Sequence, residues 1–164
     1  MIIKHFKPSM HEIAPYIKEV ISVGKEVRLT VTGFSMYPLL RGGSDDVILA
    51  KPSKIKKYDV VLFERENGEY IFHRVIKVKG NILTIAGDNE TKKEYPVSKK
   101  RVIASMKSFV RSGKTYSVNA LWYKLYSRVW LFIFPARHIA ARILHNLAKL
   151  CRKLKGGHRH KKSK

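Results

Sequence analysis

The feature that most constrains the fold is a long stretch of short apolar runs between two segments of helical periodicity. Between Glu26 and Val118, apolar residues often occupy every second position, and Gly, Asn, Asp and Ser residues that favour turns separate the runs. Many short strands at even spacing are typical of an antiparallel sheet that coils on itself. The sequence therefore predicts a mainly β fold, with a coiled antiparallel β-sheet or partial barrel. The predicted strands cover residues 27–31, 46–50, 59–63, 70–78, 82–85 and 102–110.

A short helix is predicted before the first strand. Ser9 and Glu12 have the spacing of a capping box, in which each side chain bonds the backbone N–H of the other residue. Apolar residues then recur at helical spacing, so we expect an amphipathic helix from about 10 to 23 that ends at Gly24. One helix is too little for a helix-turn-helix DNA reader, which needs two packed helices.

The C-terminal part is predicted to be helical again. Residues 121–134 are aromatic and apolar with two basic residues one turn apart, and Pro135 is expected to break or bend this helix. Residues 139–154 form a basic amphipathic pattern that is typical of a helix on a membrane surface. Packing on the β domain or on a partner is the alternative. The chain is thus divided into an N-terminal helix (1–24), a β domain (25–118), an amphipathic helical segment (119–154) and a disordered basic tail (155–164).

The net charge of +22 is concentrated in the C-terminal part of the chain. All 12 acidic residues lie at or before Glu94, so residues 95–164 contain 18 of the 34 lysines and arginines and no acid. Such a block suits an anionic surface of lipid headgroups or nucleic acid. A nucleic-acid partner is disfavoured because no paired recognition helix, zinc module or aromatic platform accompanies the charge. We therefore expect residues 121–154 to bind an anionic membrane surface.

No part of the sequence is predicted to be a cleavable signal peptide or a clear transmembrane helix. The first residues lack a long apolar core. No stretch reaches the roughly 18 uncharged apolar residues that a spanning helix needs. The expected location is therefore peripheral, on the cytoplasmic side of a membrane. Cys151 is the single cysteine, which excludes an internal disulfide.

Three short motifs contain the parts of a nucleophilic site. Ser35 lies in Gly-Phe-Ser-Met-Tyr-Pro, His73 in a strand-like run, and Asp88 in Gly-Asp-Asn. A serine hydroxyl needs a nearby base, and imidazole, with a reference pKa of about 6.5, exchanges protons near neutrality. Gly33 permits an unusual backbone angle, so this turn could aim backbone N–H groups at an oxyanion. Each residue alone also has an ordinary interpretation: a turn serine, a strand histidine and a turn aspartate.

Together, four motifs resemble the conserved boxes of type I signal peptidases. That family lies within a wider superfamily that includes LexA-like self-cleaving repressors. The resemblance covers roughly residues 27–110. In bacterial signal peptidases the position before Arg-Val is a lysine base, whereas here it is His73, as in the endoplasmic-reticulum and archaeal branch. The motifs are Gly-x-Ser-Met-x-Pro (33–38), Asp-Val-Val-Leu-Phe (59–63), His-Arg-Val-Ile (73–76) and Gly-Asp-Asn (87–89).

The resemblance implies a serine endopeptidase that removes a leader or signal peptide from a precursor. It implies Ser35 as nucleophile and His73 as general base. Asp88 is the first candidate for the acid that orients His73, and Glu94 is the alternative. The family has a coiled β domain, binds an extended peptide substrate as an added strand, and uses no metal or organic cofactor. Because no spanning anchor is visible, a dedicated processing peptidase fits this chain better than general secretion.

Two other classes of function stay open at this stage. One is a nucleic-acid-binding basic protein, and the other is a catalytically idle scaffold on a membrane surface. No metal site is predicted, because the remaining histidines form no cluster at metal-ligand spacing. Asp46 is interpreted as a structural residue at the start of a strand.

Overall fold

The computed structural model describes residues 9–136. Helix α1 (Met10–Ser22) begins with the predicted capping box, in which Ser9 Oγ accepts from the Glu12 N–H at 3.4 Å and Ser9 N–H donates to Glu12 Oε2 at 2.6 Å. Gly24 follows the helix with a φ of 79°, a conformation that glycine adopts readily. The predicted helix over 10–23 is confirmed.

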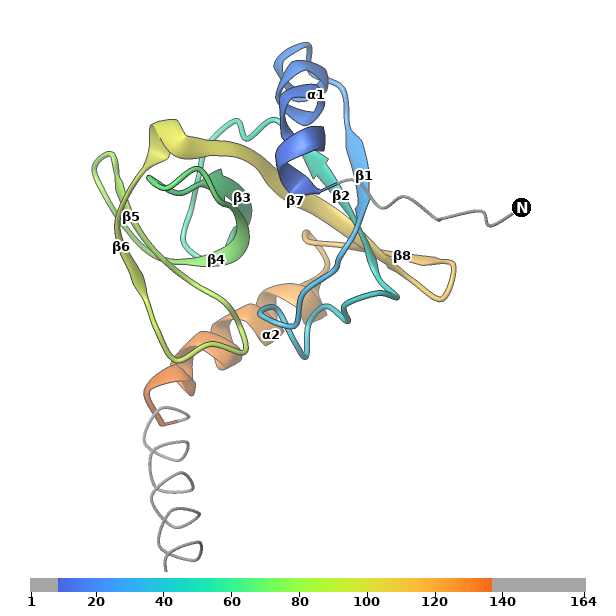
Figure 1. The fold of residues 1–164 in the computed structure, drawn as a ribbon. Coiled ribbons are helices and arrows are strands. Elements are labelled where there is room, and N and C mark those ends of the chain that lie inside the picture. The colour runs from blue at the N-terminus through green and yellow to red at the C-terminus, as the bar shows by residue number, and fades with distance from the viewer. Residues whose placement is uncertain (1–8, 137–164) are drawn as a thin grey trace, which may run out of the picture. The chain divides into compact units, whose positions relative to one another are not determined.

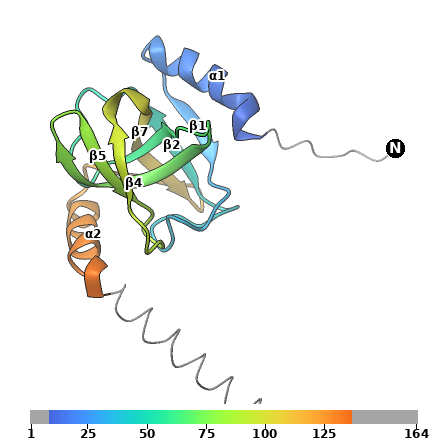
Figure 2. The same cartoon turned by 60° about the vertical axis from the view of Figure 1, so that its left-hand side comes forward.

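The sheet contains eight strands, and every strand pair is antiparallel. The strand order is β1–β2–β7–β3–β4–β5–β6, and β8 pairs with β7 (Figure 1). The sheet curls but does not close (Figure 2). The predicted mainly antiparallel β fold is confirmed. The strands are β1 (Val27–Thr30), β2 (Asp46–Ala50), β3 (Val60–Glu64), β4 (Tyr70–Lys79), β5 (Ile82–Ala86), β6 (Glu94–Ser98), β7 (Val102–Arg111) and β8 (Lys114–Ser117), with a 3-10 turn, η1 (Lys99–Arg101), before β7.

All predicted strands are present, each within one residue of its expected ends, but β6 and β8 were missed. Strand β6 contains Pro96, which lacks a backbone donor and is tolerated on a terminal strand such as this one. Strand β8 has only four residues and pairs with the end of β7 through the turn at Ser112 and Gly113. Neither strand has the apolar alternation by which the others were predicted.

Strand β3 is buried on both faces and separates two apolar clusters. Val60 and Leu62 belong to the larger cluster, which also receives the buried face of α1, whereas Val61 and Phe63 belong to a smaller cluster with β4, β5 and β6. Successive side chains of a strand point to opposite faces, so one run of four apolar residues serves both clusters. The elements that pack on the two faces of β3 are thereby held in place relative to each other.

Helix α2 (Leu121–Phe132) follows β8, and the chain bends at Ile133, as expected from Pro135. Residues up to Arg128 belong to one compact unit and those from Val129 to a second. Among the helices of residues 9–136, none combines the length and the apolar character needed to cross a membrane. Three predictions lie outside the described residues: the amphipathic helix over 139–154, the tail at 155–164, and the surroundings of Cys151.

Candidate active site

Ser35 lies in the loop between β1 and β2. Apolar side chains of this loop pack into the larger core cluster. Met36, Leu39 and Leu40 are buried directly after it. The loop turns back on itself, because the Leu40 N–H donates to the Met36 carbonyl at 2.9 Å. Ser35 is half-buried and lines a pocket of about 330 Å³. A loop anchored by buried apolar side chains thus places Ser35 at the wall of a cavity.

The predicted reason for Gly33 is wrong. Gly33 is not among the glycines with positive φ, so its backbone does not require glycine. A Cβ at Gly33 would meet nothing within 4 Å, and the residue is exposed at the pocket wall. The positive φ in this loop, 79°, belongs to Gly43, and Gly42 leaves room for Gly33, since a Cβ at Gly42 would lie 2.6 Å from the Gly33 carbonyl oxygen. Only the folded loop brings these two glycines together.

His73 lies in β4 opposite Val61 of β3 and is buried. Its Nδ1 atom is 3.0 Å from Glu94 Oε1, and its Nε2 atom is 3.5 Å from Glu90 Oε1. Burial lowers the pKa of His73 below its usual range, while the charges of Glu90 and Glu94 act in the opposite direction. The imidazole is therefore biased toward its neutral form, which can accept a proton.

The structure brings Ser35 and His73 together at Gly87. A Cβ built on Gly87 would lie 2.6 Å from the Ser35 carbonyl oxygen and 3.1 Å from His73 Nε2. The Asn89 N–H also donates to the Ser35 carbonyl at 2.7 Å. The Gly-Asp-Asn motif thus contacts the serine loop through its backbone, and its glycine leaves space that the Ser35 carbonyl and the His73 ring both border.

Asp88 was the first choice for the acid that orients His73, and the structure places it elsewhere. Its two oxygens accept from Arg74 Nε and Nη2, each at 2.7 Å, and both side chains are 2% exposed. His73 and Arg74 are neighbours in β4, so their side chains point to opposite faces of the sheet. Asp88 pairs on the Arg74 face. Glu94, the alternative, is the acid at His73 Nδ1, and Glu90 lies on the Nε2 side of the ring.

Arg65 completes this group of charges, and no local pattern in the sequence points to it. Its Nε donates to Glu94 Oε2 at 2.7 Å and its Nη2 to Glu94 Oε1 at 2.8 Å. Burial raises the pKa of Glu94, but the hydrogen bonds and charge of Arg65 outweigh this effect and leave the pKa below its usual value. Glu94 is therefore ionised beside His73. Glu90 was also missed, although it follows the Gly-Asp-Asn motif directly.

The pocket beside Ser35 lies between two strand edges. Leu29 and Thr30 of β1 line one wall, and β4 residues Tyr70 to His73 line another. Strand β1 ends the sheet, and this part of β4 pairs with β3 alone among the strands of residues 9–136. Four successive antiparallel pairings join β1 to β4 through β2, β7 and β3, so the two edges run in the same direction.

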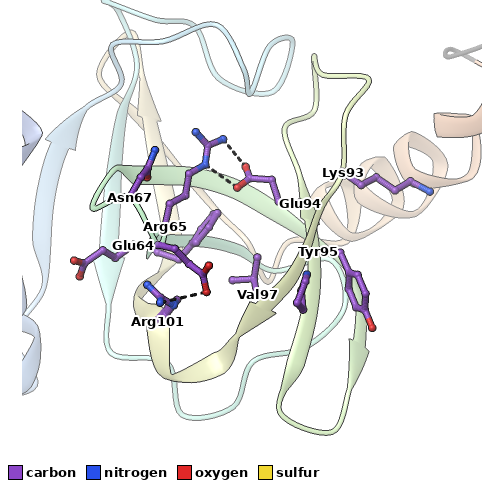
Figure 3. A pocket seen from close by; sticks show the side chains of 11 residues that line it. Glu64, Arg65, Asn67, Lys93, Glu94, Tyr95, Val97 and Arg101 are labelled. Atoms are coloured by element: carbon purple, nitrogen blue, oxygen red, sulfur yellow. Dashed lines mark hydrogen bonds and ion pairs between the residues drawn. The ribbon is translucent and has the colours of Figure 1, made fainter.

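A second cleft of about 410 Å³ lies between the β3–β4 hairpin and β6 (Figure 3). Arg65 and Glu94 form part of its wall, with Tyr95 and Val97 of β6, and Arg101 pairs there with Glu66 at 3.5 Å. The Arg65–Glu94 pair is thus reachable from this cleft, while Arg65 also lines the pocket of Ser35.

Within residues 9–136, no group of three His, Cys, Asp or Glu side chains is arranged to bind a metal ion. No protein-family model matches the chain, and no curated protein matches it either. The interpretation of the site therefore depends on its own geometry.

Proposed function

We propose that the chain is a serine endopeptidase similar to type I signal peptidases, in which Ser35 is the nucleophile, His73 the general base and Glu94 the orienting acid. The observation that carries the proposal is the convergence at Gly87 of the Ser35 backbone and His73 Nε2. An ionised carboxylate at Nδ1 favours the tautomer whose Nε2 lone pair accepts a proton from serine.

The reaction follows from these positions. Ser35 Oγ attacks the peptide carbonyl carbon as His73 Nε2 takes its proton, and Glu94 stabilises the resulting imidazolium. Within the described residues the Ser35 N–H donates no hydrogen bond, and we assign it to the oxyanion of the tetrahedral intermediate. His73 then gives the proton to the leaving amine. Water, deprotonated by His73, hydrolyses the acyl-enzyme and regenerates the hydroxyl.

We propose that the substrate is an extended peptide that enters between β1 and β4. Each edge offers backbone N–H and C=O groups, so an added strand would bond to both and continue the sheet. The pocket between the edges is lined mainly by apolar side chains, including Leu29, Val31 and Phe72. Small or apolar residues before the cut suit this lining, as in the leader of a precursor peptide.

The test is cleavage of a panel of extended precursor peptides, with mass analysis of the fragments. Ser35→Ala and His73→Ala are expected to lose at least about a thousandfold in kcat, because nucleophile and base act as one unit. Ser44→Ala is the matched control, since Ser44 lies exposed in the same loop and, among the described residues, its hydroxyl bonds only the Arg41 carbonyl. Wild-type cleavage by either site variant would refute the proposal.

We also propose that the enzyme works at an anionic membrane surface through α2. Leu121 and Leu125 are 82% and 60% exposed one turn apart, and Lys124 and Arg128 are exposed between and beyond them. Exposed apolar side chains beside cations, in a C-terminal part without any acid, suit lipid headgroups.

Flotation with phosphatidylserine-containing vesicles tests this placement. The double variant Leu121→Ser/Leu125→Ser should lose most of the vesicle-bound fraction, because the inserted apolar area disappears. Tyr16→Ser, which removes a 70% exposed aromatic side chain from α1, should bind as the wild type does. Binding to DNA without binding to vesicles would favour the nucleic-acid alternative instead.

A further inference from the structure

Arg65 connects the β3–β4 hairpin to the first residue of β6. Its guanidinium donates to both oxygens of Glu94, at 2.7 and 2.8 Å (Figure 3). Nη1 also donates to Glu69 Oε2 at 2.6 Å. We infer that Arg65 is a positioning residue for the proposed base, acting on His73 through Glu94. The inference rests on the proposed function and adds a residue to it.

The geometry explains how one side chain sets the orientation of another. The last torsion of a glutamate side chain is broad, so a lone carboxylate samples many orientations. The two parallel hydrogen bonds from Arg65 fix the plane of the Glu94 carboxylate. The same Oε1 that accepts from Arg65 Nη2 lies 3.0 Å from His73 Nδ1. The imidazole therefore has a fixed acceptor for its Nδ1–H.

The backbone of Arg65 is itself fixed by the hairpin. Its N–H donates to the Glu69 carbonyl at 2.8 Å, and its own carbonyl accepts from the Gly68 N–H at 3.0 Å. Gly68 has a φ of 85°, which the hairpin turn requires and glycine adopts without strain. The tight turn thus holds the Arg65 backbone in place, and the guanidinium reaches both Glu94 of β6 and Glu69 of the same hairpin.

Stability alone does not account for this arrangement. The Arg65 side chain is 34% exposed and that of Glu94 is 19% exposed, and ion pairs at such positions add little to folding. The charge has a chemical effect, however. Arg65 lowers the pKa of Glu94 and also opposes protonation of His73. Both effects favour an ionised acid beside a neutral base, the state in which Ser35 can lose its proton.

The test compares three variants of the full chain. Arg65→Gln removes both the positive charge and the two parallel hydrogen bonds to Glu94. Arg65→Lys retains the charge without the paired hydrogen bonds, and Arg101→Gln is the control. Arg101 lines the same cleft, and its ion pair within residues 9–136 is with Glu66, whose side chain is 88% exposed. Each variant is assayed for kcat and KM, and the His73 imidazole is titrated by NMR in a Ser35→Ala background, with His73→Gln identifying the signal.

For Arg65→Gln we expect kcat to fall about ten- to a hundredfold with little change in KM, because the base is misplaced while the substrate edges are intact. The His73 titration should move to higher pH, because a nearby cation has been removed. In Arg65→Lys, His73 should titrate close to its wild-type pH, and kcat should be intermediate between those of the wild type and Arg65→Gln. Arg101→Gln should change neither quantity.

Several results would overturn the inference. One is an Arg65→Gln enzyme with wild-type kcat and an unchanged His73 titration. A lower urea midpoint in that variant would then show that Arg65 contributes to stability and does not position the base. A raised KM at constant kcat would make Arg65 a substrate contact instead. If Arg65→Gln does not fold, an undiminished kcat in Arg65→Lys would also overturn the inference. The titration needs no activity, so it stays informative even if Ser35→Ala still cleaves peptides and the proposed function fails.

Discussion

Replacing Gly87 by alanine would place one methyl group at the point where the serine loop meets the histidine. The new Cβ would lie 2.6 Å from the Ser35 carbonyl oxygen, 3.0 Å from Glu90 Cγ and 3.1 Å from His73 Nε2. Ordinary contacts begin at 3.4 Å, so the Ser35 backbone would have to retreat by about 0.8 Å. Gly87 does not have a positive φ, so this steric overlap is the main effect of the substitution.

A displacement of this size matters more for chemistry than for folding. Overpacking of one methyl group costs about 1–3 kcal/mol of unfolding free energy. A misplacement of about 1 Å between nucleophile and base lowers kcat on the order of a hundredfold. We therefore expect Gly87→Ala to fold, with a modestly lower urea midpoint, and to lose on the order of a hundredfold in kcat for peptide cleavage.

Gly80→Ala is the matched control. Gly80 lies in the β4–β5 turn with a φ of 56° and no neighbouring atom within 4 Å of a built Cβ, so alanine there adds backbone strain of about 1–2 kcal/mol without touching the site. Its kcat should stay at the wild-type level. Equal turnover by Gly87→Ala and the wild type would mean that the Ser35 and His73 positions do not matter for cleavage, and would refute the reasoning.

The remaining predictions concern Glu94, Asp88, the pH dependence set by His73, and Glu90. Glu94→Gln should lower kcat at least about a hundredfold with little loss of stability. Asp88→Asn should instead lower the unfolding free energy by about 3–5 kcal/mol, because Arg74 stays buried without its charge partner. Kinetics and urea denaturation distinguish the two variants, and a loss of kcat in Asp88→Asn with wild-type kcat in Glu94→Gln would restore Asp88 as orienting acid. Cleavage should be lost as pH falls through the His73 pKa, which burial lowers, so the acid limb of kcat/KM should lie below about 6.5. Glu90→Gln removes a charge that raises this pKa, so its limb should shift to still lower pH, and an upward shift would contradict this assignment.

The strands and the first helix could be predicted because their signals are local. Apolar alternation in residues such as those of β2 and the capping box of α1 depends only on near neighbours in the chain. Strand β6 could not be predicted in this way. Its Pro96 and exposed Tyr95 suit a terminal strand, and only pairing with β5 identifies the segment as part of the sheet.

The candidate site likewise has one part that could be predicted from local sequence and one part that could not. Ser35 and His73 were recognisable from their local motifs, and the fold brings both to one pocket. The choice between Asp88 and Glu94 was not a local matter. Asp88 is nearer to His73 in the sequence, yet it pairs with Arg74 on the opposite face of β4, while Glu94 reaches His73 from β6, two strands away in the sheet.

By itself, the sequence determined six of the eight strands of residues 9–136 and the side chains that can supply a nucleophile and a base, because backbone preference and side-chain chemistry belong to single residues and their near neighbours. Tertiary structure decided which acid faces the imidazole, which arginine orients that acid, and which glycine makes room for the serine. These properties depend on residues of the β1–β2 loop, the β3–β4 hairpin, β4, the β5–β6 loop and β6, which meet only when the sheet curls. The physical reason is that strand alternation fixes the face of each side chain, while the pairing order of distant strands fixes its neighbours.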